Sequence, residues 1–163
     1  MLIIILKTIR NIIKGDFLRI LGLDYGDKTV GVAVSDIFGW TAQGVEIIRR
    51  NNPQEHKQSL GRISQLIDEY GVEKIVLGYP KNMDGTEGDR CTKTLEYKKR
   101  LENRFKNIPV ILWDERLSTV AAQRFLHEAD FDIKKSKSVI DKMAAVYILQ
   151  GYLDSISTKE DTK

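Results

Sequence analysis

Cysteine, histidine and long apolar runs are scarce in this chain of 163 residues. The sequence holds one cysteine, Cys91, and two histidines. A single thiol cannot form an internal disulfide, and no cluster of cysteine and histidine has the spacing of a zinc site. These absences exclude a disulfide-stabilised scaffold and a structural zinc domain, and they fit a reducing, cytoplasmic setting.

No stretch of the sequence has the composition of a membrane span. The apolar residues 2–6 are followed at once by a region that carries Lys7, Arg10 and Lys14, so the run is far too short to cross a bilayer. A secretory signal would have its charges before the apolar run and a small-residue cleavage site after it, and both are missing. We expect no membrane partner and interpret residues 1–18 as a basic, apolar N-terminal extension.

Charge of one sign is not in large excess either. The formal net charge is +3, and 30% of the residues are charged while 42% are hydrophobic, which is ordinary for a globular protein. A mildly basic chain permits a nucleic-acid partner without requiring one. Because we find no internal repeat and no linker, we expect one domain over residues 19–155 and a polar tail at 156–163.

The segment 19–36 has the pattern of two strands joined by a tight turn. An apolar run ends at Asp24 and a glycine follows two residues later. In the second strand Val30, Val32 and Val34 alternate with small residues, which predicts two distinct faces. Such a unit holds the Asp24 carboxylate at the end of a strand, where it either binds a divalent metal ion or caps the turn.

The rest of the chain alternates apolar strands with amphipathic helices. Three further strands are expected at residues 44–48, 74–78 and 110–113. Helices are expected at residues 60–70, 91–105, 120–126 and 139–153. Hairpin-length links make the first three strands antiparallel, and helical crossovers make the last two parallel. The predicted fold is therefore α/β, a mixed five-stranded sheet flanked by helices.

Acidic residues are expected to gather at one edge of this sheet. In open sheets of this kind ligands bind beyond the carboxyl ends of the parallel strands, and Asp24, the loop after Gly78 and the pair Asp114–Glu115 all fall there. Asp141 would lie on the sheet-facing side of the last helix, where a carboxylate needs a cation or hydrogen-bond donors. Capping of the helix is the alternative for Asp141.

Lysines crowd the start of the same helix. The positive end of a helix dipole disfavours these cations, and a bound polyanion would offset that penalty. A solvated loop is the alternative. The lysines are Lys134, Lys135, Lys137 and Lys142.

Four blocks of the sequence, in this order, resemble the YqgF (RuvX) family of RNase H-like nucleases. They lie at residues 23–36, 78–87, 114–119 and 141–145, so the resemblance spans nearly the whole predicted domain. It implies an RNase H-like fold and metal-dependent hydrolysis of phosphodiester bonds in structured nucleic acid. The implied substrate is the 5′ end of precursor 16S ribosomal RNA, with a Holliday junction as the alternative.

The resemblance implies that Asp24, Asp114 and Asp141 are catalytic and bind two Mg²⁺ or Mn²⁺ ions. Glu115 is the alternative to Asp114, because alternation along a strand sends the two side chains in opposite directions, and we favour Asp114. The strand that ends at Gly78 carries no acid, in contrast to the usual RNase H-like site. The missing side chain could leave a gap for metal and phosphate, and Asp84 in the following loop is a further candidate ligand.

Cationic and hydroxyl side chains near this edge are expected to contact the phosphates of a nucleic acid. They are Lys81, Arg90, Arg116, Ser118, Thr119, Lys137 and Lys142. We expect His56 to be a surface residue and Trp40 to pack rather than stack on bases.

Two other classes of protein share parts of this pattern. A kinase-like nucleotide binder would need a second glycine-rich phosphate motif and a second domain, which the sequence lacks. A non-catalytic RNA-binding factor could keep the fold without turnover. The oligomeric state is open between a monomer and a homodimer, and symmetric junction cleavage would favour the dimer.

Overall fold

The computed structural model describes residues 1–5, 19–116 and 133–160, with the side chains of the last helix described at residues 142–157. Residues 2–5 are helical and exposed. The remaining elements, in chain order, are β1 (Arg19–Tyr25), β2 (Thr29–Ser35), β3 (Ala42–Arg49), α2 (His56–Tyr70), β4 (Val72–Tyr79), α3 (Asp89–Arg104), β5 (Val110–Asp114) and α5 (Ile133–Glu160).

One mixed sheet organises the molecule. Its strand order is β3-β2-β1-β4-β5. The β1–β2 and β2–β3 pairs are antiparallel, whereas β1–β4 and β4–β5 are parallel. This arrangement confirms the predicted five-stranded sheet and brings the carboxyl ends of β1, β4 and β5 to the same edge.

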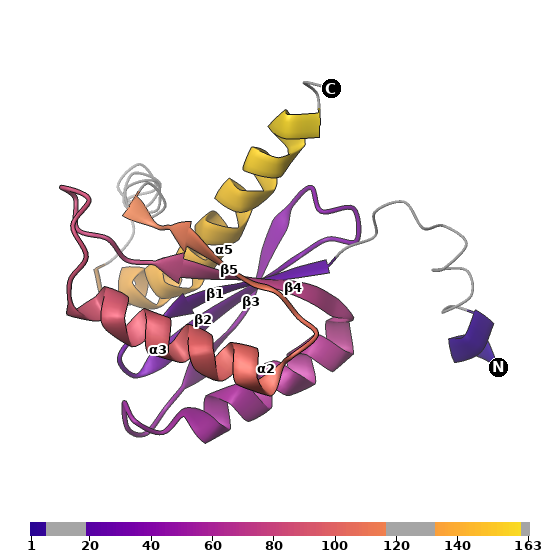
Figure 1. The fold of residues 1–163 in the computed structure, drawn as a ribbon, viewed down its shortest axis with the longest axis horizontal. Helices are drawn as coiled ribbons and strands as arrows, with labels where there is room; N and C mark the ends of the chain where they lie inside the picture. Colours follow the sequence, from indigo (N-terminus) through magenta and orange to yellow (C-terminus); the bar gives the residue numbers. More distant parts are fainter. Residues whose placement is uncertain (6–18, 117–132, 161–163) are drawn as a thin grey trace.

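Helices cover both faces of the sheet, with α2 and α3 on one side and α5 on the other (Figure 1). Residues of β2 show how the sequence encodes this: Val30, Val32 and Val34 lie in the core beneath α2 and α3, while Ala33 lies in the core beneath α5. Each fully buried aliphatic side chain of these cores contributes roughly 1.5–3 kcal/mol to folding.

Small residues let α5 pack directly on the backbone of the sheet. A Cβ atom placed on Gly22 would lie 2.7 Å from Cβ of Leu149 and 3.2 Å from the carbonyl oxygen of Ala145. A Cβ on Gly78 would lie 2.5 Å from Cδ1 of Ile148. Both glycines are therefore required by close approach of the helix rather than by their backbone angles.

Two helix boundaries differ from those predicted. Helix α5 begins at Ile133 rather than near residue 139, because lysine and serine continue a helix when no glycine or proline interrupts it. Helix α2 begins at His56, four residues before the predicted start at residue 60. The predicted end of α2 is confirmed, since Gly71 adopts the left-handed conformation with φ of 64°.

Trp40 was expected to pack, and this prediction is wrong. Its side chain is 70% exposed at the tip of the β2–β3 hairpin and stacks on Phe38 with ring centroids 4.9 Å apart. Within the described residues, no helix is both long enough and apolar enough to cross a membrane.

Candidate active site at the carboxyl edge of the sheet

Asp24 lies near the end of β1 on the face of the sheet that α5 covers. Leu21 and Leu23 belong to the opposite core and Ile20 to the core beneath α5. Because side chains alternate along a strand, Asp24 shares the α5 face with Gly22. The turn that follows is closed by a hydrogen bond of 2.8 Å from the amide of Gly26 to a backbone carbonyl.

Glu115 reaches this same face from the end of β5. The pairing of β5 with β4 aligns Gly78 with Trp113, and it continues one residue further because the Glu115 amide donates to the carbonyl of Tyr79 at 3.2 Å. Trp113 packs against the core beneath α5, so Glu115, two residues on, lies on that side as well. A Cβ on Gly78 would meet Oε2 of Glu115 at 2.6 Å.

The carboxylate of Glu115 therefore crosses over Gly78 towards Asp24. Burial, the negative charge of Asp24 and a hydrogen bond shared with Asp24 raise the pKa of Glu115 to about 8. The positive charge of Arg90 opposes this shift. The space over Gly78, which we expected to be open for metal and phosphate, holds this acidic side chain and Ile148.

Asp114 faces the other side of the sheet and has a different neighbour. Nε of Arg116 donates to Oδ1 of Asp114 at 3.0 Å, and Nη2 donates to Oδ2 at 2.6 Å. These hydrogen bonds lower the pKa of Asp114. The structure thus brings Asp24 together with Glu115, whereas Asp114 forms a two-pronged ion pair with Arg116.

The glycine-rich loop after β4 is held by its own side chains. Asp84 accepts hydrogen bonds from the amide and the hydroxyl of Thr86 at 2.9 and 2.6 Å, and these lower its pKa. Gly85 allows the turn through its positive φ of 86°. Arg116 comes close to this loop, with Nη1 3.4 Å from a Cβ position on Gly85.

The expected phosphate contacts are only partly brought to this edge. Lys81 lies 6.0 Å from the ring centre of Tyr79 at the end of β4, and Arg90 lies near enough to Glu115 to lower its pKa. The stem of Lys142 instead lies over Gly44 of β3, where a Cβ would be 2.9 Å from Cε of the lysine.

Several predicted site residues fall outside the described part of the chain. Ser118 and Thr119 precede the described part of α5, and the side chains of Lys137 and Asp141 are not among those described. Across the described ranges, no group of three acidic, histidine or cysteine residues could hold a metal ion. The described portion of the site is the pair Asp24 and Glu115.

This pair fits a divalent cation by its donor chemistry. Carboxylate oxygens are the ligands that Mg²⁺ and Mn²⁺ prefer. Two buried or half-buried carboxylates in contact repel each other when ionised, and a nearby cation relieves that repulsion. Asp24 and Glu115 are thus the described residues that could hold a metal ion.

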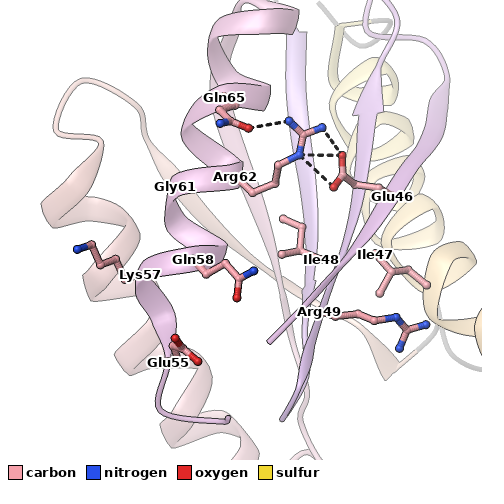
Figure 2. Close-up of a pocket in the computed structure, with 10 residues that line it drawn as sticks. All are labelled: Glu46, Ile47, Ile48, Arg49, Glu55, Lys57, Gln58, Gly61, Arg62 and Gln65. Atoms are coloured by element: carbon pink, nitrogen blue, oxygen red, sulfur yellow. Dashed lines mark hydrogen bonds and ion pairs between the residues drawn. The ribbon is translucent and has the colours of Figure 1, made fainter. Parts of the chain in front are cut away.

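A separate hollow of about 840 Å³ lies between β3 and the first half of α2 (Figure 2). Its most prominent polar feature is the ion pair between Arg62 and Glu46, with Nη2 and Oε1 2.6 Å apart. None of the predicted catalytic residues lines it. This hollow is therefore separate from the candidate active site.

The sheet order and the helices on both faces define an RNase H-like fold. A family described as RuvX: Holliday junction resolvase matches residues 18–155, so this chain belongs to that family. The match covers β1 to most of α5 and includes every candidate acid.

Curated relatives are similar over nearly their whole length. A protein of Agathobacter rectalis is 56% identical over 140 residues, which is 86% of this chain and 97% of the relative. A protein of Bacillus subtilis is also 56% identical over 140 residues and is covered completely. Both carry the provisional name pre-16S rRNA nuclease.

Among solved structures, T. thermophilus RuvC in complex with a Holliday junction substrate has a TM-score of 0.53 to this chain. The superposition covers 86% of this chain and 97% of the other at 13% identity. At this level of identity the similarity shows a shared fold.

Proposed function

We propose that this protein is a metal-dependent nuclease that processes precursor 16S ribosomal RNA in the cytoplasm. The observation that carries the proposal is the contact between Asp24 and Glu115 across the bare backbone of Gly78. The substrate is supported by the names of relatives that are 56% identical. Within this substrate, we propose that cleavage takes place at the 5′ end of the precursor.

In this proposal Asp24, Glu115 and Asp141 are the protein ligands of two Mg²⁺ or Mn²⁺ ions. Such ions supply activation of the attacking water and stabilisation of the leaving oxygen. Asp24 is positioned by the pairing of β1 with both neighbouring strands. Glu115 lies over Gly78, where Ile148 also packs.

Glu115, rather than Asp114, is the second metal-binding acid in this proposal. Asp114 is turned to the opposite face, where Arg116 forms hydrogen bonds with both of its carboxylate oxygens. We assign the Asp114–Arg116 pair a structural role at the end of β5, on the face of the sheet opposite Glu115.

Phosphate groups of the substrate are proposed to contact cations around this edge. Lys81 lies beside Tyr79, and Arg90 lies near Glu115. Arg116, Lys137, Ser118 and Thr119 complete the proposed set. Contacts of this type orient the strand without reading its sequence.

A Holliday junction is the second candidate substrate, favoured by the description of the matching family. An end-labelled precursor 16S rRNA fragment and a four-way DNA junction, each with Mg²⁺ and with Asp24→Asn as control, separate the two. We expect cleavage of the RNA that is lost in the variant. Paired symmetric cuts in the junction with the RNA intact would overturn the proposed substrate and favour a two-fold dimer. Binding without any cleavage would favour a non-catalytic factor.

A further inference from the structure

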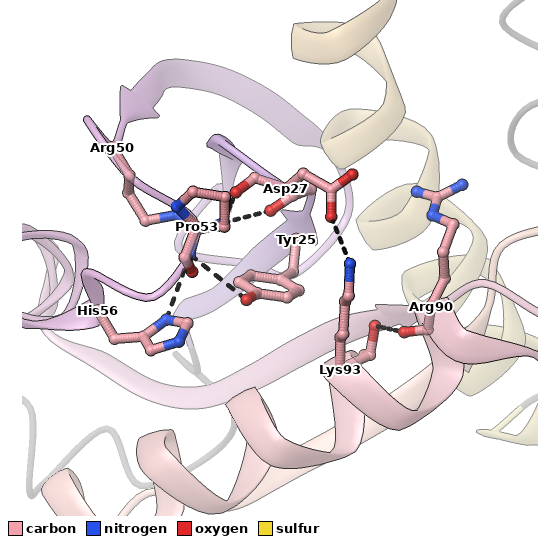
Figure 3. Close-up of polar contacts among 9 residues, drawn as sticks. Tyr25, Asp27, Arg50, Pro53, His56, Arg90 and Lys93 are labelled. Carbon is pink, nitrogen blue, oxygen red and sulfur yellow. Dashed lines mark hydrogen bonds and ion pairs between the residues drawn. The ribbon is translucent and has the colours of Figure 1, made fainter.

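Arg50, immediately after β3, is a buried cation that no prediction from the sequence singled out. Its residue is only 3% exposed. One end of the guanidinium, Nη2, donates to the carbonyl oxygens of Gly26 and Asp27, the latter at 2.8 Å. The other end, Nη1, donates to the carbonyl of Pro53 at 2.8 Å and lies 3.2 Å from Nδ1 of His56 (Figure 3).

None of these partners is a carboxylate. Among the residues that the structure describes, Nε of Arg50 has no hydrogen-bond partner. Burying a guanidinium without an opposite charge costs free energy that an apolar side chain of similar volume would not. What arginine offers instead is a planar fork that hydrogen-bonds two neighbouring acceptors at once. The arrangement therefore points to a specific role for the fork at the carbonyls of residues 26 and 27.

These two carbonyls belong to the turn that follows Asp24. The same turn is held from two other directions. The ring of Tyr25 lies beneath the Arg50 guanidinium, 4.7 Å from its centre, and stacks on Tyr97 of α3 at 4.1 Å. The carboxylate of Asp27 forms an ion pair of 3.0 Å with Lys93 of α3.

Asp24 has to be held close to Glu115, although ionised carboxylates repel each other. If the turn could relax, Asp24 would move away from Glu115. Part of the free energy of metal binding would then be needed to bring the two acids together. Outer residues that orient metal ligands typically change metal affinity by about 10–100-fold when they are removed. Arg50 contacts backbone carbonyls only two and three residues beyond Asp24.

We propose that Arg50 is a positioning residue for the metal site: its fork holds the turn at residues 25–28 so that Asp24 stays beside Glu115. This inference rests on the proposed function, because it takes these two acids to be metal ligands. It assigns Arg50 no contact with the substrate. Loss of the Arg50 guanidinium raises the metal concentration needed for activity. It leaves the cleavage rate at saturating metal close to that of the wild type.

The test is a calorimetric titration of the full chain with Mn²⁺ for the wild type, Arg50→Met, Arg50→Lys and Asp24→Asn. Arg50→Met keeps the volume of the side chain without its donors and is expected to raise the Kd by about 10-fold or more. Arg50→Lys keeps the charge but lacks the fork, and its Kd is expected to rise several-fold. Arg62→Met removes an arginine that pairs with Glu46 away from the turn, and it should leave the Kd unchanged.

Loss of stability alone would lower the melting temperature without changing the Kd of the folded protein. An unchanged Kd in Arg50→Met overturns the inference, while loss of binding in Asp24→Asn would still support the metal site. Should Arg50→Met not fold, an unchanged Kd in Arg50→Lys overturns it equally. A rise in Kd of the same size in Arg62→Met also overturns it, because the effect would then not be specific. A wild-type protein that binds no Mn²⁺ overturns the proposed function and this inference together.

Discussion

Two adjacent acids at the end of β5 face opposite sides of the sheet, and Glu115 is the one that meets Asp24. The family resemblance left the second proposed metal ligand between these two acids, and we favoured Asp114. The sequence of β5 could not show which acid faces Asp24, because this strand is apolar at every position before Asp114. Ile111 and Trp113 contact one core, while Val110 and Leu112 contact the other. A strand covered on both faces lacks the polar alternation that would reveal its orientation.

Gly78 provides a test of this arrangement at a single position. Gly78→Ala would place a Cβ 2.6 Å from Oε2 of Glu115 and 2.5 Å from Ile148, so we expect displacement of the glutamate. The Kd for Mn²⁺ should rise by about 10-fold or more, and the unfolding free energy should fall by roughly 1–3 kcal/mol. Titration calorimetry and urea denaturation measure the two effects.

Gly61 of α2 is the matched control. Nothing lies within 4 Å of a Cβ at this helical position, so Gly61→Ala should raise the unfolding free energy by up to about 1 kcal/mol and leave metal binding unchanged. Equal metal affinity in Gly78→Ala and Gly61→Ala would contradict the assignment of Glu115.

Asp114→Asn tests the other acid. The Asp114–Arg116 pair is partly exposed, with side-chain exposures of 37% and 34%, and such pairs contribute about 1 kcal/mol or less. We expect a loss of unfolding free energy of that size in urea denaturation and a Kd for Mn²⁺ within about two-fold of the wild type, since in this proposal Asp114 neither binds the metal nor orients a residue that does. Complete loss of metal binding would show that Asp114 belongs to the site.

Among the elements, helix α5 shows what the sequence could and could not predict. Its apolar positions predicted a helix on the sheet, and the buried residues Ala145, Ile148 and Leu149 confirm it. The closeness of that packing depends on glycines in three strands, Gly22, Gly44 and Gly78. Glycines so far apart in the sequence form one packing surface for α5 only after the strands pair. Periodicity within a single segment could therefore not predict this surface.

The surroundings of His56, at the start of α2, could not be predicted from the sequence either. His56 was expected at the surface, and this is wrong: its ring is half-buried and lies 5.6 Å from that of Tyr97. Arg50 appeared in the sequence as one more basic residue in a charged loop. Its role depends on carbonyl groups of a turn 23 residues away or more, and backbone acceptors leave no mark in the amino-acid pattern.

His56 gives α2 a dependence on pH. Burial lowers the pKa of His56 below its ordinary value of 6.5, with the positive charges of Arg100 and Arg50 adding to the effect and Glu96 opposing it. Below pH 6.5 the imidazole takes up a proton in the unfolded chain but stays neutral in the folded chain until the pH reaches the lowered pKa. The contribution of neutral His56 to the unfolding free energy is therefore fully present above pH 6.5 and is lost as the pH falls towards the lowered pKa.

Urea denaturation of the wild type and His56→Gln between about pH 8 and about pH 5 measures this effect. The difference in unfolding free energy between the two proteins should shrink, or change sign in favour of the variant, as the pH falls. A difference that stays constant over this range would show that the imidazole does not titrate differently in the folded and unfolded states.

For the whole molecule, the sequence predicted the sheet, its mixed topology and the edge at which the acids meet. Those predictions succeeded because they depend on the order of strands and helices and on the lengths of their connections, which the chain carries directly. The substrate is a different matter. Metal chemistry and phosphate contacts are alike for RNA and branched DNA, so the fold does not distinguish them.

The most direct measurement is single-turnover cleavage of an end-labelled precursor 16S rRNA fragment with Mg²⁺, comparing the wild type with Asp24→Asn, Glu115→Gln and Asp114→Asn. We expect the first two variants to lose activity to a similar extent, by roughly 100-fold or more, because each lacks a metal ligand. Asp114→Asn should retain most of the wild-type rate. Full activity in Glu115→Gln together with an inactive Asp114→Asn would contradict the site proposed for this protein.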